Sequence, residues 1–313
     1  MKMSHRPWSD LSQDILTLIS NRLGLIELIR FRSVCKQWKS SSSTSTAEIE
    51  SSPGLNPWFL FYGENLSPRS ITRTGEKYAI RIPELEGAAV LASSHGWLLV
   101  FKNGSIFFLC PFSRSRIDLP SSPFSDLADH VASFSAPPSD PGCAVAVISR
   151  IDGRRLVLKL LRRGEEEWTS FEYSYGVSSL DAVKCAAHRG GSFYFFDGQD
   201  RLLMFSIKEL GPKLCRVVKI TDPKERAKCE TMPFWCKKES GLKKWLEEDD
   251  LPEGASISTC GTYVESETER GSDHVIFHEN IEAAEKSDGD QRLKLKGVWI
   301  HPRFFQVYKD GRW

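Results

Sequence analysis

The sequence predicts an α+β multidomain protein, in which a small N-terminal module of three helices precedes an all-β, propeller-like domain. Three observations lead to this prediction. Apolar residues in positions 8–39 recur at helical spacing. A tract rich in Ser and Thr follows them. Hairpin signals then recur 45 and 49 residues apart, a period that is typical of repeated sheets such as propeller blades.

The composition is that of a globular chain of 313 residues, for which about two domains are expected. Eight cysteines form no CxxC pair, and we expect them to be reduced and buried. The sequence has no run of about 18 apolar residues and no signal-peptide core. We therefore expect no membrane partner and a location in the cytoplasm or nucleus.

The net charge of +1 is unevenly distributed, because residues 1–39 carry +4 and the remainder carries −3. A basic helical module favours encounter with an acidic partner, although a solvated helical face gives the same pattern. The chain contains no run of five Lys or Arg residues. We therefore expect no nucleic-acid partner.

The first 39 residues form the predicted helical module, with the apolar pattern beginning at Trp8. Gly24 is predicted to end the first helix in a left-handed cap. Three short helices bury too little apolar surface to be stable alone, so a partner is expected. The three apolar sets are Leu11, Ile15, Leu18, Ile19 and Leu23; Leu25, Leu28, Ile29 and Phe31; and Val34, Cys35 and Trp38.

The order of these residues resembles the F-box. The opening Leu11-Ser12 pair, the apolar ladder and the closing run from Val34 to Trp38 carry the resemblance. The family's Pro is replaced by Ser12, which we expect to act as an N-cap by accepting a hydrogen bond. The resemblance implies that the module binds a Skp-type adaptor. The expected adaptor contacts are Leu11, Ile15, Ile19, Leu28, Val34, Cys35 and Trp38.

A linker is predicted at residues 40–56, where nine of the first thirteen residues are Ser or Thr. Such a tract buries little surface and is expected to act as a flexible tether. The predicted domains are therefore the helical module at 1–39, the linker at 40–56 and the β domain at 57–313. An ordinary helical hairpin packed on the rest of the chain is the alternative for the first of these.

Repeated hairpins define the β domain, and their turns are expected at Asn103-Gly104, Asp152-Gly153 and Asp197-Gly198. Each hairpin is followed by a further predicted strand, so each repeat supplies about four strands, as a blade does. These strands lie near Ile117–Pro120, Trp168–Phe171 and Val217–Ile220. The aromatic residues of the hairpins are expected to form the core between blades.

The repeat is clear to about residue 220 and weak beyond it. Ile257–Val264 and His274–His278 are expected strands, and the apolar run Gly297–Tyr308 begins a hairpin that has no return strand. Either Trp58–Tyr62 and Tyr78–Ile82 supply the missing strands, or the β domain is incomplete at the C-terminus.

This β half resembles a domain that follows the F-box in a large plant family of the F-box/kelch-like type. The residues that carry the resemblance are His95–Leu99, Phe108–Arg114 and Ile117–Pro120, with Cys110 at a position where Asn is usual. The match extends from about residue 57 to 220. The last third departs from the pattern.

Catalytic and metal-binding patterns are not found. Thr74-Gly75-Glu76-Lys77 lacks parts of a phosphate loop. His274 and His278 lie on a predicted strand without a third ligand at a useful spacing. We therefore expect no catalytic residue, no cofactor and no metal site.

The resemblance to F-box proteins implies a non-catalytic, substrate-recognition subunit of an SCF-type (cullin-RING) ubiquitin ligase. In this prediction the adaptor links the chain to a cullin, and the β domain binds an unknown substrate protein. Two alternatives remain open. One is a small-ligand binder or enzyme built on the propeller, with the helices as a dimerisation hairpin. The other is a truncated, non-functional relative.

Overall fold

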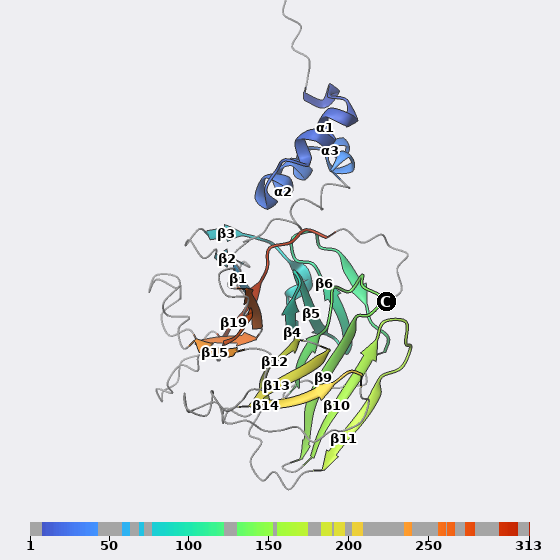
Figure 1. Ribbon diagram of the computed structural model, residues 1–313. Coiled ribbons are helices and arrows are strands. Elements are labelled where there is room, and N and C mark those ends of the chain that lie inside the picture. Colours follow the sequence, from blue (N-terminus) through green and yellow to red (C-terminus); the bar gives the residue numbers. More distant parts are fainter. Residues whose placement is uncertain are drawn as a thin grey trace, which may run out of the picture.

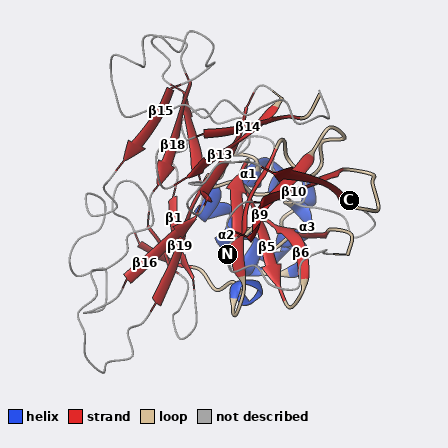
Figure 2. Ribbon diagram, turned by 90° about the horizontal axis from the view of Figure 1, so that it is seen from below, coloured by secondary structure: helices blue, strands red, loops and turns tan. Residues whose placement is uncertain are grey.

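The structure is a computed structural model of the whole chain. It describes residues 8–42, 58–62, 69–71, 77–121, 130–152, 155–174, 183–189, 191–197, 202–208, 235–239, 256–260, 262–266, 273–278, 294–305 and 313. The helices stand at one end of the β body in Figure 1, and the view from the opposite end in Figure 2 shows them behind the strands.

The helical module contains the three expected helices, preceded by one 3-10 turn. The elements are η1 (Trp8–Asp10), α1 (Gln13–Ser20), α2 (Leu25–Val34) and α3 (Lys36–Ser41). Helix α3 continues two residues past the predicted module end at residue 39, and Ser41 and Ser42 are both buried. The first residues of the predicted linker thus belong to the helical module.

The two predicted caps of the module have different outcomes. Ser12 is the N-cap of α1, as expected, but its side chain makes no capping hydrogen bond within the described part of the chain. The left-handed cap at Gly24 is wrong. Gly24 has φ −66° and is the N-cap of α2, whereas α1 ends at Ser20 with Asn21 as its C-cap. The two helices are separated by residues 21–24, and Gly24 lies at the α2 end of this loop.

The described strands form five sheets, and no described ladder joins one sheet to another. The first sheet has the order β16-β19-β1-β2-β3, with β1 (Trp58–Tyr62), β2 (Arg69–Ile71), β3 (Lys77–Ala79), β16 (Ser256–Cys260) and β19 (Lys294–Ile300). The second is β4 (Ala89–Ser94), β5 (Trp97–Lys102), β6 (Ser105–Leu109) and β7 (Arg116–Asp118), with the 3-10 turn η2 (Pro83–Leu85) before it.

The third sheet is β8 (His130–Phe134), β9 (Ala144–Asp152), β10 (Arg155–Arg162) and β11 (Thr169–Ser174). The fourth is β12 (Val183–Arg189), β13 (Ser192–Asp197) and β14 (Leu202–Ser206). The fifth has the order β15-β18-β17, with β15 (Trp235–Glu239), β17 (Thr262–Ser266) and β18 (Asp273–His278). The second and third are consecutive antiparallel sheets of four strands, the arrangement of propeller blades.

The predicted hairpins are confirmed as strand pairs. Asn103 and Gly104 have φ 51° and 78°, the pair of left-handed residues that a type I′ turn needs. The pairs β9–β10 and β13–β14 are antiparallel hairpins, and the residues at their tips, 153–154 and 198–201, lie outside the described residues. Strands β7 and β11 follow two hairpins as expected, whereas Val217–Ile220 lies outside the described residues.

The first and last described strands meet in one sheet. Strand β1 pairs antiparallel with β19, with Trp58 opposite Ile300 and Tyr62 opposite Lys296. Of the two alternatives from the sequence, the pairing supports the first, because Trp58–Tyr62 supplies a partner for the last apolar run. The expected run to Tyr308 is shorter as a strand, since β19 ends at Ile300 and residues 301–305 leave the sheet.

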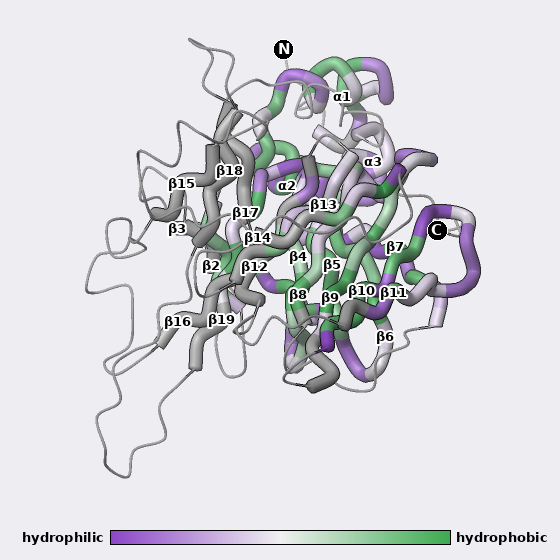
Figure 3. Tube along the Cα trace, turned by 60° about the horizontal axis from the view of Figure 1, so that its bottom comes forward, coloured by the Kyte–Doolittle hydropathy of each residue, from purple (hydrophilic) through white to green (hydrophobic). Residues whose placement is uncertain are grey.

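The core of the β body follows the strands. Figure 3 shows the most hydrophobic stretches along β4, β5, β8, β9 and β10, and hydrophilic residues at the connecting loops. The expected aromatic core is confirmed at Phe107, Phe108, Phe193 and Phe195, each at most 1% exposed. No helix among the described residues is long and apolar enough to cross a membrane.

Candidate functional site

An exposed apolar face lies on the helical module. Four large apolar side chains of the described residues are open to solvent: Trp8 (73% exposed), Ile15 (46%), Leu18 (58%) and Val34 (58%). Ile15 and Leu18 are three residues apart on α1 and therefore share one helical face. Grouped apolar side chains on a surface are typical of a protein interaction site.

Hydrogen bonds between the helices bring the parts of this face together. The Gln37 side-chain amide donates to the Leu11 carbonyl at 3.1 Å, and the Thr17 hydroxyl donates to the Ser41 carbonyl at 3.0 Å. The first contact joins α3 to the residue before the N-cap of α1, and the second joins the end of α3 to α1 itself. Because Val34 and Cys35 directly precede α3, the first contact places the α2–α3 corner beside the start of α1.

The seven predicted adaptor contacts fall into three groups. Ile15, Val34 and Cys35 are exposed, Leu11, Ile19 and Trp38 are partly buried, and Leu28 is fully buried. The Trp38 ring packs on Phe31 with 4.4 Å between centroids. Trp38 therefore holds α3 on α2 through most of its surface.

Leu28 is the predicted contact that the structure does not place on the open face. Its side chain is 0% exposed and belongs to the core of the β body. A side chain without accessible surface offers a partner nothing to contact, so Leu28 stabilises the packing of α2 instead. Two exposed apolar side chains of the module were not among the predicted contacts: Leu18, which the apolar ladder already contained, and Trp8, at the start of the predicted module.

Helix α2 turns its apolar face toward the β body. Leu25 is 6% exposed and belongs with Leu28 to the same apolar cluster as Trp58, Ile300 and Phe304. The alternative of a hairpin packed on the rest of the chain thus describes α2. It does not describe α1, whose Ile15 and Leu18 remain open.

Arg32 of α2 contacts both the end of α3 and the β body. Its guanidinium donates to the Ser42 carbonyl at 3.0 Å and to the Ser42 hydroxyl at 2.8 Å. The same group lies 4.9 Å from the centre of the Phe304 ring. Burial lowers the pKa of Arg32, but an arginine stays charged at neutral pH, so this cation–π contact is maintained.

A second candidate region is a pocket of about 710 Å³ among the loops of the second and third sheets. Arg163, in its wall, donates to the Pro138 carbonyl at 2.9 Å, and Glu165 pairs with Arg162 at 3.4 Å. The pocket combines acidic and apolar side chains. It is lined by Asp118, Leu119, Pro120, Ser121, Pro141, Arg163, Gly164, Glu165, Glu166 and Trp313.

One partly buried histidine, His188, lies on β12 of the β body. Burial, reinforced by the neighbouring His95, lowers the pKa of His188 to about 4. Its ring packs on Phe193 at 5.0 Å, and its Nε2 has no hydrogen-bond partner among the described residues. The described residues contain no group of three His, Cys, Asp or Glu side chains suited to a metal ion. The side chains of His274 and His278 lie outside the described set.

Comparison with protein families identifies both parts of the chain. The F-box domain family matches residues 8–46, and the KIB1-4 beta-propeller family matches residues 66–266. The first match covers all the described helices. The second contains the second, third and fourth sheets and reaches the end of β17.

Related proteins share the same combination. An F-box/kelch-repeat protein of Arabidopsis thaliana is 30% identical over 211 residues, which is 61% of this chain and 52% of the relative. A second F-box/kelch-repeat protein of that plant is 25% identical over 203 residues, 63% of this chain and 56% of the relative. The chain therefore spans about half the length of the curated relatives it matches.

Among solved structures, the WD40 domain of SCAP from fission yeast covers 54% of this chain and 40% of its own, at 9% identity and a TM-score of 0.29. That score is too low to support an argument. The family matches are sufficient without it, because the propeller match spans more than half of the chain and the F-box match precedes it. The chain thus belongs to the family of plant F-box proteins in which the F-box is followed by a KIB1-4 β-propeller.

Proposed function

We propose that this chain is the substrate-recognition subunit of an SCF-type ubiquitin ligase. In this proposal the F-box binds a Skp-type adaptor, the adaptor links the chain to a cullin, and the β body binds a target protein. The observation that carries the proposal is the open apolar face with Ile15 and Leu18, because a helix face of this kind fits a partner's apolar groove. The charge of +4 on residues 1–39 supports encounter with an acidic adaptor.

The proposed mechanism is proximity. A target bound to the β body meets the ubiquitin-charged enzyme of the same complex at a raised effective concentration. No residue of this chain performs chemistry in this mechanism, which agrees with the adaptor-type role of F-box relatives. The chain would act in the cytoplasm or nucleus.

The loops around the pocket between the second and third sheets are the proposed target-binding surface. Binding residues are concentrated on loops that a rigid scaffold positions. Glu166 lines the pocket and is exposed, the exposed Glu167 follows it on the β10–β11 loop, and Leu119 and Pro120 also line the pocket. This combination fits a peptide segment that carries a basic side chain with an apolar stem.

The test is the affinity of the full chain for a recombinant Skp-type adaptor. The double variant Ile15→Ala, Leu18→Ala is expected to bind at least tenfold more weakly, since losing two apolar anchors costs about 1.4 kcal/mol or more. The matched control is Arg30→Ala, an exposed residue on α2, for which the affinity is expected to stay within about twofold.

The melting temperature of each variant separates a loss of binding from a loss of folding. Ile15 and Leu18 are exposed, so their truncation is expected to leave the melting temperature almost unchanged. An unaltered affinity for the double variant, or no affinity of the wild-type chain for the adaptor, would contradict the proposal.

A further inference from the structure

We propose that a rigid platform on the β body holds the F-box in one orientation, and that Phe304 and Arg32 act as its positioning residues. The platform consists of the 3-10 turn η2, the turn at residues 110–115 and the segment 301–305, which we name the strap. The proposal rests on the proposed function, because it concerns how the adaptor-binding helices are aimed relative to a bound target.

The first step is the buried underside of α2. Leu25 and Leu28 are 6% and 0% exposed, and they share one apolar cluster with side chains of every part of the platform. Leu23, Ile26 and Ile29 pack against the same cluster. A helix attached only through a flexible tether would leave these side chains open to water. The platform members of the cluster are Leu85, Phe112 and Phe304, and Ile82, the N-cap of η2, belongs to the same cluster.

The second step is the fixation of the strap on the second sheet. The Ser115 hydroxyl donates to the Phe305 carbonyl at 3.0 Å, and the Cys110 thiol lies 3.5 Å from the Arg303 carbonyl. The Phe305 ring stacks on Trp97 with 5.3 Å between centroids. The strap therefore follows the end of the second sheet closely, although it makes no strand of its own.

The third step is the contact from the strap to the helices. Phe304 is 3% exposed, and the Arg32 guanidinium lies over its ring at 4.9 Å. Arg32 also donates to Ser42, at the end of α3. One side chain thus links α2, α3 and the strap: the bonds to Ser42 hold the Arg32 guanidinium in place within the helical module, and a rotation of the module against the body would break its contact with Phe304. Figure 1 shows the strap continuing from β19 toward α2.

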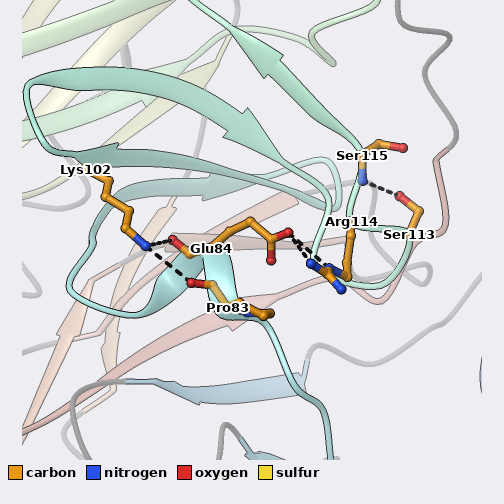
Figure 4. A network of polar contacts seen from close by, with 6 residues as sticks. All are labelled: Pro83, Glu84, Lys102, Ser113, Arg114 and Ser115. Carbon is orange, nitrogen blue, oxygen red and sulfur yellow. Dashed lines mark hydrogen bonds and ion pairs between the residues drawn. The ribbon is translucent and has the colours of Figure 1, made fainter.

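The fourth step is the clamp on η2, which Figure 4 shows from close by. The Lys102 ammonium donates to the carbonyls of Pro83 and Glu84, at 3.3 Å each. On the other side the Arg114 guanidinium donates twice to one Glu84 carboxylate oxygen, at 2.7 and 3.0 Å. The clamp fixes η2 between β5 and the turn at residues 110–115, directly beneath the apolar cluster that receives α2.

The turn at residues 110–115 overlaps one of the stretches that resemble the plant β domain, Phe108–Arg114, and the platform gives it a role. Phe112 is 8% exposed and faces the cluster with Leu28, whereas Arg114 has φ 60° and points its guanidinium at Glu84. The Ser113 hydroxyl accepts a hydrogen bond from the Ser115 amide at 3.2 Å. The turn therefore forms part of the surface on which the F-box packs, rather than a ligand-binding site.

A fixed orientation of the F-box matters because the transfer of ubiquitin to a bound target depends on orientation as well as on effective concentration. With a flexible tether alone, the orientation of the adaptor relative to the target would differ from one molecule to the next. The platform instead defines one direction for every molecule, and the pocket between the second and third sheets then lies at a fixed distance from the adaptor.

The experiment uses pulsed electron paramagnetic resonance to measure the distribution of distances between two spin labels. The sample is the full chain with a recombinant Skp-type adaptor bound. The labels are carried by non-canonical residues at the exposed Arg30 and Glu166, so the native cysteines stay unmodified. The wild-type chain is expected to give one narrow distribution. Phe304→Ala is expected to broaden it at least twofold while its affinity for the adaptor stays within about threefold.

A folding control accompanies the distance measurement. If Phe304→Ala does not fold, the double variant Lys102→Ala, Arg114→Ala replaces it, because both side chains lie at the surface of the clamp and the same broadening is expected. A broad distribution in the wild-type chain, or a narrow one in the folded variant, would overturn the platform. Failure of the adaptor to bind the wild-type chain would contradict the proposed function instead, and the labelled chain alone would still test the platform.

Discussion

Helices α1 and α2 have similar apolar content and opposite surroundings. On α1, Ile15 and Leu18 are 46% and 58% exposed, whereas on α2 Leu25 and Leu28 are 6% and 0% exposed. The apolar residues of α1 lie mainly on one face, whereas those of α2 are spread around the helix, and neither pattern says which helix the rest of the chain covers. The difference comes from the strap and η2, which cover only α2. Most apolar side chains of α2 are therefore used for internal packing, whereas Ile15 and Leu18 of α1, with Val34 at the end of α2, remain available to a partner.

The comparison also explains why an exposed apolar face is tolerated. Burying the α2 face gains about 25 cal/mol per Å² of apolar surface, which anchors the module without help from α1. The α1 face leaves apolar surface in water, and such a surface is usually retained because a partner covers it. The following predictions test this division, from the largest expected effect to the smallest.

The strongest prediction compares one leucine from each helix. Leu28→Ala should lower the free energy of unfolding of the full chain by about 2–5 kcal/mol, because it leaves a cavity in a packed core. Leu18→Ala should change it by less than about 0.5 kcal/mol, because its side chain is exposed. Urea denaturation of both variants gives the two values. Equal losses would mean that the two helices are packed alike.

The second prediction concerns the close contact between the strap and the β4–β5 turn. Gly96 has φ 77°, and an added Cβ there would lie 2.4 Å from the Arg303 Cβ. Gly104 has nearly the same φ, 78°, and open space around it. Gly104→Ala is expected to lower the free energy of unfolding by about 1 kcal/mol, because alanine is strained at this positive φ. Gly96→Ala is expected to cost about 1–3 kcal/mol more, and thermal melts of both variants measure the difference. Matching losses would show that the strap does not press on this turn.

A pH effect is expected from the body and not from the helical module. Burial lowers the pKa of His188 to about 4 from 6.5, so the unfolded chain binds this proton first as the pH falls. The stability that His188 contributes is complete above pH 6.5 and is lost as the pH falls toward 4. After allowance for partial exposure, the loss between pH 7 and 5 is about 1 kcal/mol.

The variant His188→Phe should reduce the dependence of the free energy of unfolding on pH. A phenylalanine ring keeps the packing on Phe193 but carries no titrating group. The slope should not vanish, because burial and the neighbouring His301 also lower the pKa of His95, against a smaller opposing effect of Asp140. Denaturation curves at several pH values measure the slope. An identical slope in the variant would assign the effect to other groups.

The smallest effect is expected at the clamp. The Arg114 side chain is 54% exposed and its partner Glu84 is 20% exposed. Arg114→Ala should therefore lower stability by less than about 1 kcal/mol. Arg116→Ala is a comparison away from η2, because it removes a similarly exposed pair with Asp118 together with a cation–π contact on Phe107. Urea denaturation compares the two variants. A loss of several kcal/mol from Arg114→Ala would contradict the prediction that the clamp contributes little to the free energy of unfolding.

The sequence was informative where a local rule decides the structure. Asn103-Gly104 predicted a hairpin because only a few residue types adopt its backbone angles, and the apolar ladder with the run at 34–38 predicted the helical module. The sequence was misleading where tertiary contacts decide the position of a side chain. Leu28 and Ile15 look equivalent in the ladder, and Gly24 looks like a helix end. Only the position of the strap, about 270 residues away, distinguishes the leucine, and only the early end of α1 makes Gly24 an N-cap.

The pairing of β1 with β19 could be predicted only as one of two alternatives, for a similar reason. Apolar runs at residues 58–62 and 297–300 show that each stretch needs a partner, but the runs do not say which. The structure adds a local constraint, since a Cβ on Gly297 would lie 2.2 Å from the Phe59 ring. Gly297 thus leaves room for that ring beside β19.

The most direct test of the division between the helices is hydroxyl-radical footprinting of the full chain with and without a Skp-type adaptor. The account predicts that Ile15 and Leu18 are modified rapidly in the free chain and become protected when the adaptor binds. It predicts that Leu25 and Leu28 are protected in both states. Strong modification of Leu25 and Leu28 in the free chain, or no change at Ile15 and Leu18 on binding, would contradict it.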